Sequence, residues 1–590
     1  AIVIYAYGFE VTQVNLEELG SPTRQQSLAR ILRALARPDF LEYEQEEFVV
    51  ERPIYVPCPA GGAPASAPPA AGTPYLDAPP CAEPESTIVV SGHNFAPNTS
   101  GPLNFIPPSG VSLQLARIET DGGGDFVLNV ELRDRTAEEA QFLRAVTRRN
   151  VGWPHLSTNG AETIAKILET VFMALLATTI GTALAIPLSF FAARNLMRTV
   201  TSPLTSVALS VVAVPIGAWL GLLVARSLSL SGYQLSDSIA FNIGGVLLLP
   251  LLIWGLLLWV MAPTRAAVAT GGAQPSRAPA AVAVVAVVIV GAAILAGYAL
   301  ADLLLLLGQS LQPYLADFAF LGGFLANIGG ILRLLIAPIC ALIGAGVLMS
   351  YAGQLGQTVV ERVEPGTGKV INLVLGALAG ATLAALIGAV LAWFYELRDP
   401  ALTLYWPALI GALAGAFVAF RTPYNASLPV GLTIYTVART VFNALRSIEA
   451  LIMVIVFAVW VGIGPFAGVL ALGLHTVAAL AKLYSEQVES IAAGPMEAIL
   501  ATGANRLQMI VYAVIPQIVP PYISFTMYRW DINVRMSTII GFAGGGGIGF
   551  LLQQNINLLN YRAASAQILA IAIVVSLMDY LSSAMRQRAI

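Results

Sequence analysis

Long apolar segments dominate this 590-residue chain and decide what it can fold into. A helix that crosses a membrane needs about 20 mostly apolar residues, because only a helix pairs all of its own backbone polar groups in hydrocarbon. Charged residues make up only 11% of the chain, whereas an average soluble domain has about 25%. The sequence therefore predicts an all-α polytopic membrane protein.

The same length rule locates the individual spans. Residues 1–7 are expected to be the end of an N-terminal transmembrane helix that begins before Ala1, and counting this segment gives about twelve spans. The other predicted spans cover residues 164–191, 203–226, 239–262, 280–307, 334–351, 370–394, 403–420, 447–463, 466–484, 518–543 and 563–582.

The positions of Lys and Arg in the short loops predict the orientation, since cytoplasmic loops are enriched in these residues. One set of loops holds little beyond Arg398 and Arg562. The other set of loops is rich in these residues and is therefore expected in the cytoplasm. This orientation makes the C-terminus cytoplasmic and places residues 8–160 outside. That basic set comprises Arg194, Arg198, Arg265, Arg277, Arg362, Lys369, Arg421, Arg439, Arg446, Arg506, Arg586 and Arg588.

The outer segment changes character along its length. Residues 8–57 contain an amphipathic helix suited to a membrane surface, and residues 58–85 form a Pro/Ala-rich linker. Residues 86–134 alternate apolar and polar positions between Gly, Asn and Pro turns, which predicts a small all-β module. Its phrases SGHNFAPN and TDGGGDFVLNV resemble immunoglobulin-like repeats of bacterial surface proteins. A passive spacer is favoured over a partner-docking role, and residues 135–163 are expected to form a juxtamembrane helix.

Cysteine count and net charge exclude several classes of protein. Three cysteines are too few for a disulfide scaffold or a Cys-rich metal site. Cys58 and Cys81 flank the linker and are the candidate disulfide in an oxidising compartment. Cys340 lies in an apolar run and is expected to be a packing residue. A net charge of −3 gives no reason to expect a nucleic-acid partner.

One stretch is unusually polar for this chain, EAILATGANRLQMIVYAVIP at residues 497–516. Its two halves can form short helices, and Gly503 between them permits a sharp turn because glycine has unrestricted φ. Pro516 closes the segment where the chain re-enters the membrane. The pattern predicts a rigid helix-turn-helix between two spans.

This segment resembles the cytoplasmic EAA loop of ABC-importer permeases, although Ile499 and Ala513 depart from the usual pattern. Three further segments resemble the phosphonate-type permease, the membrane subunit of phosphonate, phosphate and phosphite importers. These are IPLSFFAARN (186–195), LRSIEALIMVIVFAVWVGIGPFAGVLALGLHTVAALAKLYSEQVESI (445–491) and YRWDINVRMSTIIGFAGGGGIG (528–549).

The resemblance implies a type I ABC importer permease core made of residues 164–198 and 435–590. The coupling loop is residues 485–516. Residues 199–434 are an inserted six-span region, for which a peripheral scaffold or lipid-facing collar is favoured over a second transport path. The implied ATPase-coupling residues are Glu497, Ala498, Gly503, Ala504 and Pro516.

The resemblance also implies the partners and the cargo. It implies a homodimer of permeases in a bacterial cytoplasmic membrane, with separate cytoplasmic ABC ATPase subunits and an extracytoplasmic substrate-binding protein. The chain itself is then expected to have no catalytic residues and no cofactor or metal. The implied substrate is phosphonate or a related phosphorus oxyanion. A secondary transporter or channel, or a permease-derived structural membrane subunit, remains the alternative.

Ionisable residues inside a membrane are costly, so they line a pathway or pair with each other. Arg529, Asp531, Arg535 and His475 fall within predicted spans and are the candidate substrate path, with arginine suited to oxyanions. The alternatives are structural. Asp531 and Arg535 have the i, i+4 spacing of a helical ion pair, and His475 can bond a neighbouring helix.

Two phosphate-binding motifs are rejected on context. GGGGIG (544–549) follows a membrane span rather than a strand and lacks the downstream acidic residue of a dinucleotide site. We expect it to allow close helix approach or to form an outer gate. EPGTGKV (364–370) has Val370 where a phosphate loop has Ser or Thr.

Overall fold

A computed structural model describes residues 2–12, 20–59, 61–64, 72–233, 238–270 and 279–589. Within these ranges ten helices are long and apolar enough to cross a membrane, or eleven if one bent pair counts as a single span. A mostly helical polytopic membrane protein is confirmed, but with fewer spans than predicted. Helix α1 (Ile2–Val11) has only 10 residues. Arg277 and linker residues 60 and 65–71 lie outside the described ranges.

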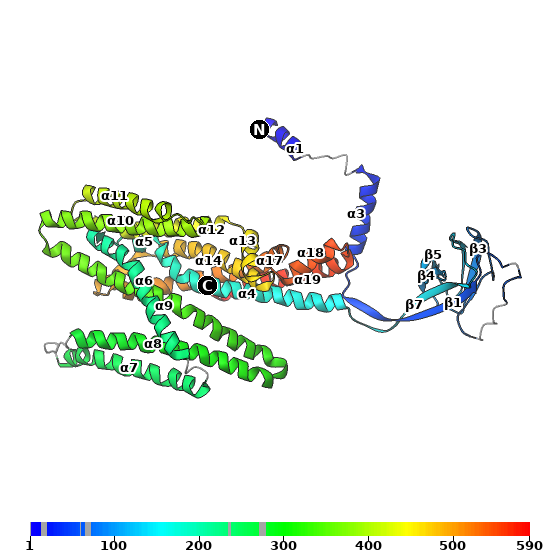
Figure 1. Cartoon of the computed structure of the whole chain (residues 1–590), viewed down its shortest axis with the longest axis horizontal. Coiled ribbons are helices and arrows are strands. Elements are labelled where there is room, and N and C mark those ends of the chain that lie inside the picture. Colours follow the sequence, from blue (N-terminus) through cyan, green and yellow to red (C-terminus); the bar gives the residue numbers. More distant parts are fainter. Residues whose placement is uncertain are drawn as a thin grey trace. The chain divides into compact units, whose positions relative to one another are not determined.

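A small β region, residues 41–156, follows helix α3 (Pro22–Leu35) (Figure 1). It contains two antiparallel sheets that enclose a core of fully buried side chains, such as Val90 and Phe105. One sheet has the order β1 (Leu41–Ile54), β7 (Gln141–Leu156), β4 (Ser100–Ile106) and β5 (Leu113–Glu119). The other has the order β2 (Tyr75–Asp77), β3 (Thr87–His93) and β6 (Phe126–Glu131).

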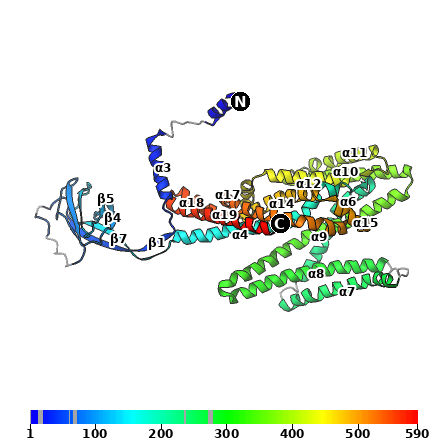
Figure 2. The ribbon, with the colours of Figure 1, turned by 180° about the vertical axis from the view of Figure 1, so that it is seen from behind.

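The prediction of a juxtamembrane helix at residues 135–163 is wrong. Residues 141–156 form strand β7, and helix α4 (Thr158–Phe191) begins only after it. The β7 side chains from Gln141 alternate between buried and exposed at first, as a strand with one covered face requires. Strand β7 pairs with β1 along most of its length. β1 itself lies in the segment 8–57, where only an amphipathic helix was expected (Figure 2).

Cys58 and Cys81 are joined by a disulfide bond with a Cα–Cα distance of 5.0 Å. The bond ties the two ends of the Pro/Ala-rich linker to each other. Cys340 is a free, buried thiol, as its apolar surroundings predicted.

An aspartate organises the turn before β6. The Asp121 carboxylate accepts hydrogen bonds from the backbone N–H groups of Asp125 at 2.9 Å and Gly123 at 2.8 Å. Because these bonds favour the ionised form, they lower the pKa of Asp121 below its usual value of 3.8.

A junction of hydrogen bonds connects the β region to two long helices, α4 and α19 (Tyr561–Ala589). The Asp39 carbonyl accepts from the Ser157 hydroxyl at 2.9 Å and the Asn159 amide at 3.0 Å. The Asp39 N–H donates to the Arg562 carbonyl at 3.2 Å. The chain between α3 and β1 is therefore held by the ends of both helices.

The chain divides into two compact units, residues 1–189 with 440–590, and residues 190–439. The first unit contains the β region and a helix bundle with a buried apolar core that includes Ala177, Leu472 and Ile540. Besides α4 and α19, its main helices are α13 (Ala450–Val461), α14 (Pro465–Glu489), α17 (Ile515–Gly541) and α18 (Gly547–Asn557).

The span predicted at residues 447–463 is wrong in detail. Helix α12 (Val430–Ser447) and α13 meet at an angle of 89°. At 1.5 Å per residue, the 12 residues of α13 extend only about 18 Å, less than a hydrocarbon core of about 30 Å. Glu449 precedes α13 in an extended conformation and ends the helical path. A count of apolar residues cannot detect such a turn.

The second unit contains the six long helices predicted for the insertion (Figure 1). They are α6 (Leu204–Tyr233), α7 (Ile239–Thr270), α8 (Pro279–Leu311), α9 (Ala319–Arg362), α10 (Pro365–Tyr395) and α11 (Trp406–Arg421). Shorter elements are α5 (Arg194–Met197), the pair β8 (Ser202–Pro203) and β9 (Ser427–Leu428), and a π-helical turn (Ala401–Tyr405).

Small residues bring α10 and α11 close together, as their glycine- and alanine-rich sequences predicted. A Cβ on Gly380 would lie 2.1 Å from the Gly411 carbonyl oxygen, and one on Gly415 would lie 2.0 Å from that of Gly376. Such distances are impossible for any side chain, so the helix backbones are in direct contact. An ion pair at 2.7 Å between Arg333, which is half-buried, and Asp302, which is buried, connects α9 to α8.

Candidate functional site

Residues 493–514 form a helix-turn-helix between the long helices α14 and α17. Helix α15 (Ala493–Ala501) is followed by a turn and by α16 (Arg506–Met509), which continues as a π-helical segment (Ile510–Val514). Gly503 in the turn has φ +81°, a left-handed conformation that glycine adopts without strain. Pro516 is the second residue of α17, which follows the π-helical segment without a break.

Local hydrogen bonds make this loop rigid. The Asn505 N–H donates to the Gln508 side chain at 2.8 Å, and the Gln508 N–H donates to the Asn505 side chain at 2.9 Å. This reciprocal pair is a capping box at the start of α16. At the base, the Gln517 amide accepts from the Ala492 N–H at 3.1 Å and donates to the Ala513 carbonyl at 2.7 Å. The start and the end of the loop are therefore tied together.

The loop presents an exposed surface. Glu497, Ala498 and Gly503 are exposed, and Ala504 is half-buried. Leu507 is 70% exposed, so the loop presents an apolar side chain as well as the carboxylate of Glu497. A surface that mixes apolar and polar groups on a rigid helix pair is suited to contact with a partner protein.

A polar stripe runs along one face of α17. Its members are spaced at i, i+4, i+7, i+11 and i+15, so they lie above one another on the helix. Four of them are buried and Thr526 is half-buried. We call this the α17 stripe, and it consists of Tyr522, Thr526, Arg529, Asn533 and Ser537.

At its centre the α17 stripe joins three helices. The amide of Asn533, which is fully buried, donates to Thr178 on α4 at 2.8 Å and to Thr476 on α14 at 2.9 Å. Arg529 donates through Nε to Thr476 at 3.4 Å and through a terminal nitrogen to Nδ1 of His475. His475 therefore contacts a neighbouring helix, as one of its two predicted interpretations required.

The charges in this region are not balanced. Arg535 pairs with Asp531 on the same helix at 2.8 Å, as the spacing predicted, and with Asp579 on α19 at 3.8 Å. Arg529 is only 8% exposed, and its described hydrogen-bond partners are the hydroxyl of Thr476 and the ring of His475. Since neither is an anion, no carboxylate of the described part of the chain forms an ion pair with the buried guanidinium of Arg529, and Glu449 interacts with it only electrostatically.

A second polar group lies at the other end of the stripe. The rings of Tyr484 on α14 and Tyr522 on α17 are stacked, with centroids 3.8 Å apart. The Tyr484 hydroxyl bonds Thr526 at 2.6 Å, and the Tyr522 hydroxyl bonds Ser189 on α4 at 2.9 Å. Helices α4, α14 and α17 are therefore hydrogen-bonded to one another at two positions along the stripe.

The glycine-rich loop before α18 packs closely, as predicted. Gly546 and Gly547 have φ values of +74° and +71°, and a Cβ on Gly546 would lie 2.7 Å from the Pro465 nitrogen. The Gly547 N–H donates to the Glu169 carboxylate at 2.8 Å. Glu169 also pairs with Lys166 at 2.7 Å. A carboxylate from α4 therefore caps the N-terminus of α18, where the helix dipole favours negative charge.

Sequence analysis missed most of these polar contacts. The i, i+4, i+7 spacing of polar residues in α17 was a usable signal for the stripe. No such sequence signal marked Thr178 and Glu169, because an isolated hydroxyl or carboxylate group on a helix does not indicate its hydrogen-bond partner.

A bundle of apolar helices with a buried polar stripe and a projecting helix-turn-helix has the features of the membrane component of a transporter. A family model described as binding-protein-dependent transport system inner membrane component matches residues 408–588. This range contains the helix-turn-helix and α17.

Three curated relatives match the same part of the chain. The phosphite transport system permease protein of Stutzerimonas stutzeri is 41% identical over 180 residues, which are 30% of this chain and 64% of that protein. The phosphate-import permease protein of Mycolicibacterium smegmatis is 38% identical over 182 residues, 30% of this chain and 33% of that protein. The putative cryptic phosphonate transport system permease protein of Escherichia coli is 46% identical over 118 residues, 20% of this chain and 97% of that protein.

The chain belongs to the family of binding-protein-dependent transport system inner membrane components. It spans less than two thirds of the phosphite permease that it matches, at 64% of that protein's length.

Proposed function

We propose that this chain is the permease subunit of an ATP-driven importer for a phosphorus oxyanion, with phosphonate, phosphate and phosphite as the candidate substrates. The observation that carries the proposal is the similarity of the C-terminal helices to permeases named for phosphite, phosphate and phosphonate, at 38–46% identity. The permease core then consists of residues 164–198 and 435–590.

The proposed assembly contains two copies of this chain, two cytoplasmic ABC ATPase subunits and an extracytoplasmic substrate-binding protein. The C-terminus is cytoplasmic in this assembly, in a bacterial cytoplasmic membrane. The β region is an outer, immunoglobulin-like spacer, and residues 199–434 are a scaffold. ATP hydrolysis takes place on the separate ATPase subunits.

The helix-turn-helix is the proposed contact with the ATPase. Its capping box and the Gln517 bonds make it a rigid lever, and Glu497, Ala498, Gly503, Ala504 and Pro516 are its proposed coupling residues. When ATP binding closes the ATPase dimer, the loop moves with it and shifts α17. Each partner thereby biases an equilibrium between inward-open and outward-open states.

Arg529 is the proposed attraction for the anion. A buried guanidinium that forms no ion pair with a described carboxylate favours a negative charge nearby, because its own charge is poorly screened in an apolar environment. Its planar donors match the geometry of an oxyanion. Asp531 and Arg535 complete the proposed path, whereas His475 positions Arg529 through their hydrogen bond.

Uptake by reconstituted vesicles tests the proposal. The chain is reconstituted with its ATPase and binding protein, and uptake of labelled phosphate, phosphite and methylphosphonate is measured with and without ATP. We expect uptake of at least one oxyanion, and only with ATP. Uptake that persists without ATP or the ATPase would show a secondary transporter instead. If no ATPase subunit copurifies with the chain, a structural role is favoured.

A further inference from the structure

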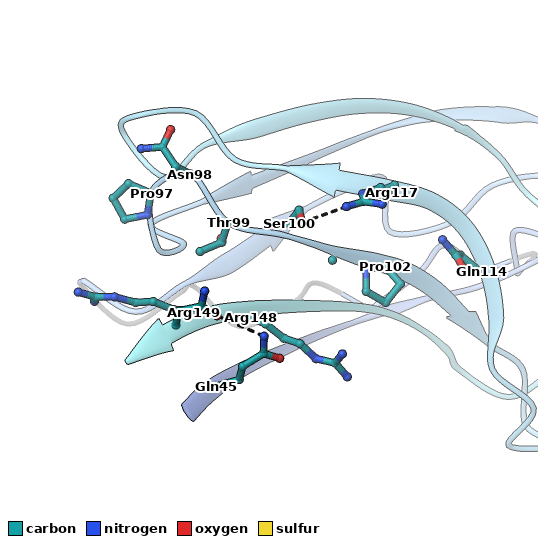
Figure 3. Close-up of a pocket in the computed structure, with 12 residues that line it drawn as sticks. Gln45, Pro97, Asn98, Thr99, Ser100, Pro102, Gln114, Arg117, Arg148 and Arg149 are labelled. Carbon is teal, nitrogen blue, oxygen red and sulfur yellow. Dashed lines mark hydrogen bonds between the residues drawn. The ribbon is translucent and has the colours of Figure 1, made fainter. Parts of the chain in front are cut away.

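A pocket on the β region carries a positive charge that the transport proposal does not use. Its volume is about 670 Å³, and three arginines line it, Arg117, Arg148 and Arg149 (Figure 3). The other lining residues are amide and hydroxyl side chains, prolines and a glycine, and no Asp or Glu is among them. A concave surface of guanidinium and amide donors is suited to an anion with several oxygen atoms.

Two of the arginines lie on either side of one serine. Ser100 on β4 is opposite Arg148 on the neighbouring strand β7, and Arg117 on β5 donates to the Ser100 hydroxyl at 3.3 Å. Neighbouring strands are about 4.8 Å apart, and Arg117 is opposite Pro102, two residues along β4 from Ser100, so the two arginine backbones are separated by roughly 12 Å. The bond to Glu47 holds Arg148 toward β1, whereas Arg117 reaches toward Ser100 on β4. A ligand must therefore extend across the pocket to contact both guanidinium groups.

Each of these two guanidinium groups is braced on one side. Arg148 donates through Nε to Glu47 at 2.7 Å, which leaves its terminal N–H groups available. Arg117 lies 3.9 Å from Glu119. Glu47 and Glu119 do not line the pocket, so they orient the arginines without occupying the space between them. Bracing of this kind lowers the entropy lost when an anion binds.

The remaining lining suits the rest of a small molecule. Figure 3 shows the side chains of Arg148 and Arg149 extending in opposite directions. Asn98, Gln114 and Asn150 supply amide groups that can donate and accept. The volume of the pocket is much larger than one tetrahedral oxyanion needs, and no aromatic side chain lines it for stacking on a sugar.

We propose that this pocket binds a small organic phosphate or phosphonate that extends across it, with the oxyanion held by the lining arginines and the organic part among the amides. The site is separate from the α17 stripe. It does not depend on which substrate the permease core transports.

Calorimetry on the full chain in lipid nanodiscs tests this site, with glycerol 3-phosphate and inorganic phosphate as probes. Each of Arg117→Gln and Arg148→Gln is expected to weaken glycerol 3-phosphate binding roughly tenfold or more, since hydrogen bonds to charged groups are strong. Arg133→Gln is the matched control, because Arg133 is exposed on the same region and does not line the pocket. Equal binding by wild type and the double variant Arg117→Gln/Arg148→Gln would overturn the proposal.

Arg529→Gln separates this pocket from the permease core. If this variant loses the calorimetric signal while the pocket variants keep it, the anion binds in the core and the proposed pocket is refuted. Loss of binding only in the pocket variants supports the proposal, whatever happens to uptake.

A measurement on the wild-type chain avoids any folding defect in the variants. Phenylglyoxal modifies accessible arginines, and mass spectrometry gives the rate at each site. We expect glycerol 3-phosphate to slow the modification of Arg117 and Arg148 at least threefold and to leave Arg133 unchanged. Equal protection of all three, or of none, contradicts the site.

Discussion

The turn at Gly503 offers a direct test of the proposed lever. Gly503 has φ +81°, and a residue with a Cβ loses about 1–2 kcal/mol in this left-handed region. No atom lies within 4 Å of the position that its Cβ would occupy. Gly503→Val therefore adds backbone strain without a clash. At this cost the equilibrium ratio of the closed to the open turn falls roughly 5- to 30-fold.

Two controls separate strain from other effects of the substitution. Gly503→Asn adds a side chain that tolerates the left-handed conformation, so we expect it to behave almost as wild type. Gly494→Val changes a glycine in the same loop that has free space and lies outside the left-handed region. It tests whether any valine in the loop is harmful.

The assay measures substrate-stimulated ATPase activity and uptake in proteoliposomes that contain the complete assembly. We expect Gly503→Val to lower both activities by up to this factor, while assembly with the ATPase is partly retained. If Gly503→Val stimulates and transports as well as Gly503→Asn, the turn conformation is not required for coupling and the lever mechanism is refuted.

Four further changes test other parts of the structure. Glu497→Lys reverses the charge on the exposed loop and should abolish stimulation of the ATPase while the chain still inserts, as membrane fractionation will check. Arg529→Met removes the buried charge and should raise the KM for uptake roughly tenfold or more. Arg529→Lys keeps the charge and should raise the KM less. Equal KM values in wild type and both variants argue against a role of Arg529 in the substrate path. Gly380→Leu should separate α10 from α11 and cost about 1–3 kcal/mol, and thermal unfolding should show a lower Tm than for Gly346→Leu, which has free space around it. Asp121→Asn should lower the hydrogen-exchange protection of the β region near neutral pH. The folded state lowers the pKa of Asp121, so its ionised carboxylate stabilises the fold at pH values above the usual pKa of 3.8. The difference between the variant and wild type should vanish as the pH falls below the pKa of the folded state, and a constant difference at all pH values contradicts this prediction.

Several features were predictable from the sequence because their causes are local. Each long span follows from the number of consecutive apolar residues, since a helix in hydrocarbon satisfies its own backbone. The turn at Gly503 follows from one residue with unrestricted φ. The contact of α10 with α11 was indicated by glycine and alanine at repeated positions.

Other features depend on partners that are remote in the chain. Strand β7 was predicted as a helix because its partner β1 lies in a different segment, and pairing between remote strands leaves only a weak local signal. The bend of 89° between α12 and α13 occurs within a segment whose apolar composition resembles a single span. In both places composition was compatible with two conformations, and packing selected one.

The sequence by itself determined the membrane-spanning class, most of the spans and the projecting loop, because these depend on hydrophobicity and on single-residue conformational preferences. Only the tertiary structure decided which polar groups meet. Asn533 bonds Thr178, a residue 355 positions away, and Glu169 caps a helix that begins at Gly547. A buried polar group must find a partner, but the sequence does not indicate which one, since that choice depends on how the helices pack.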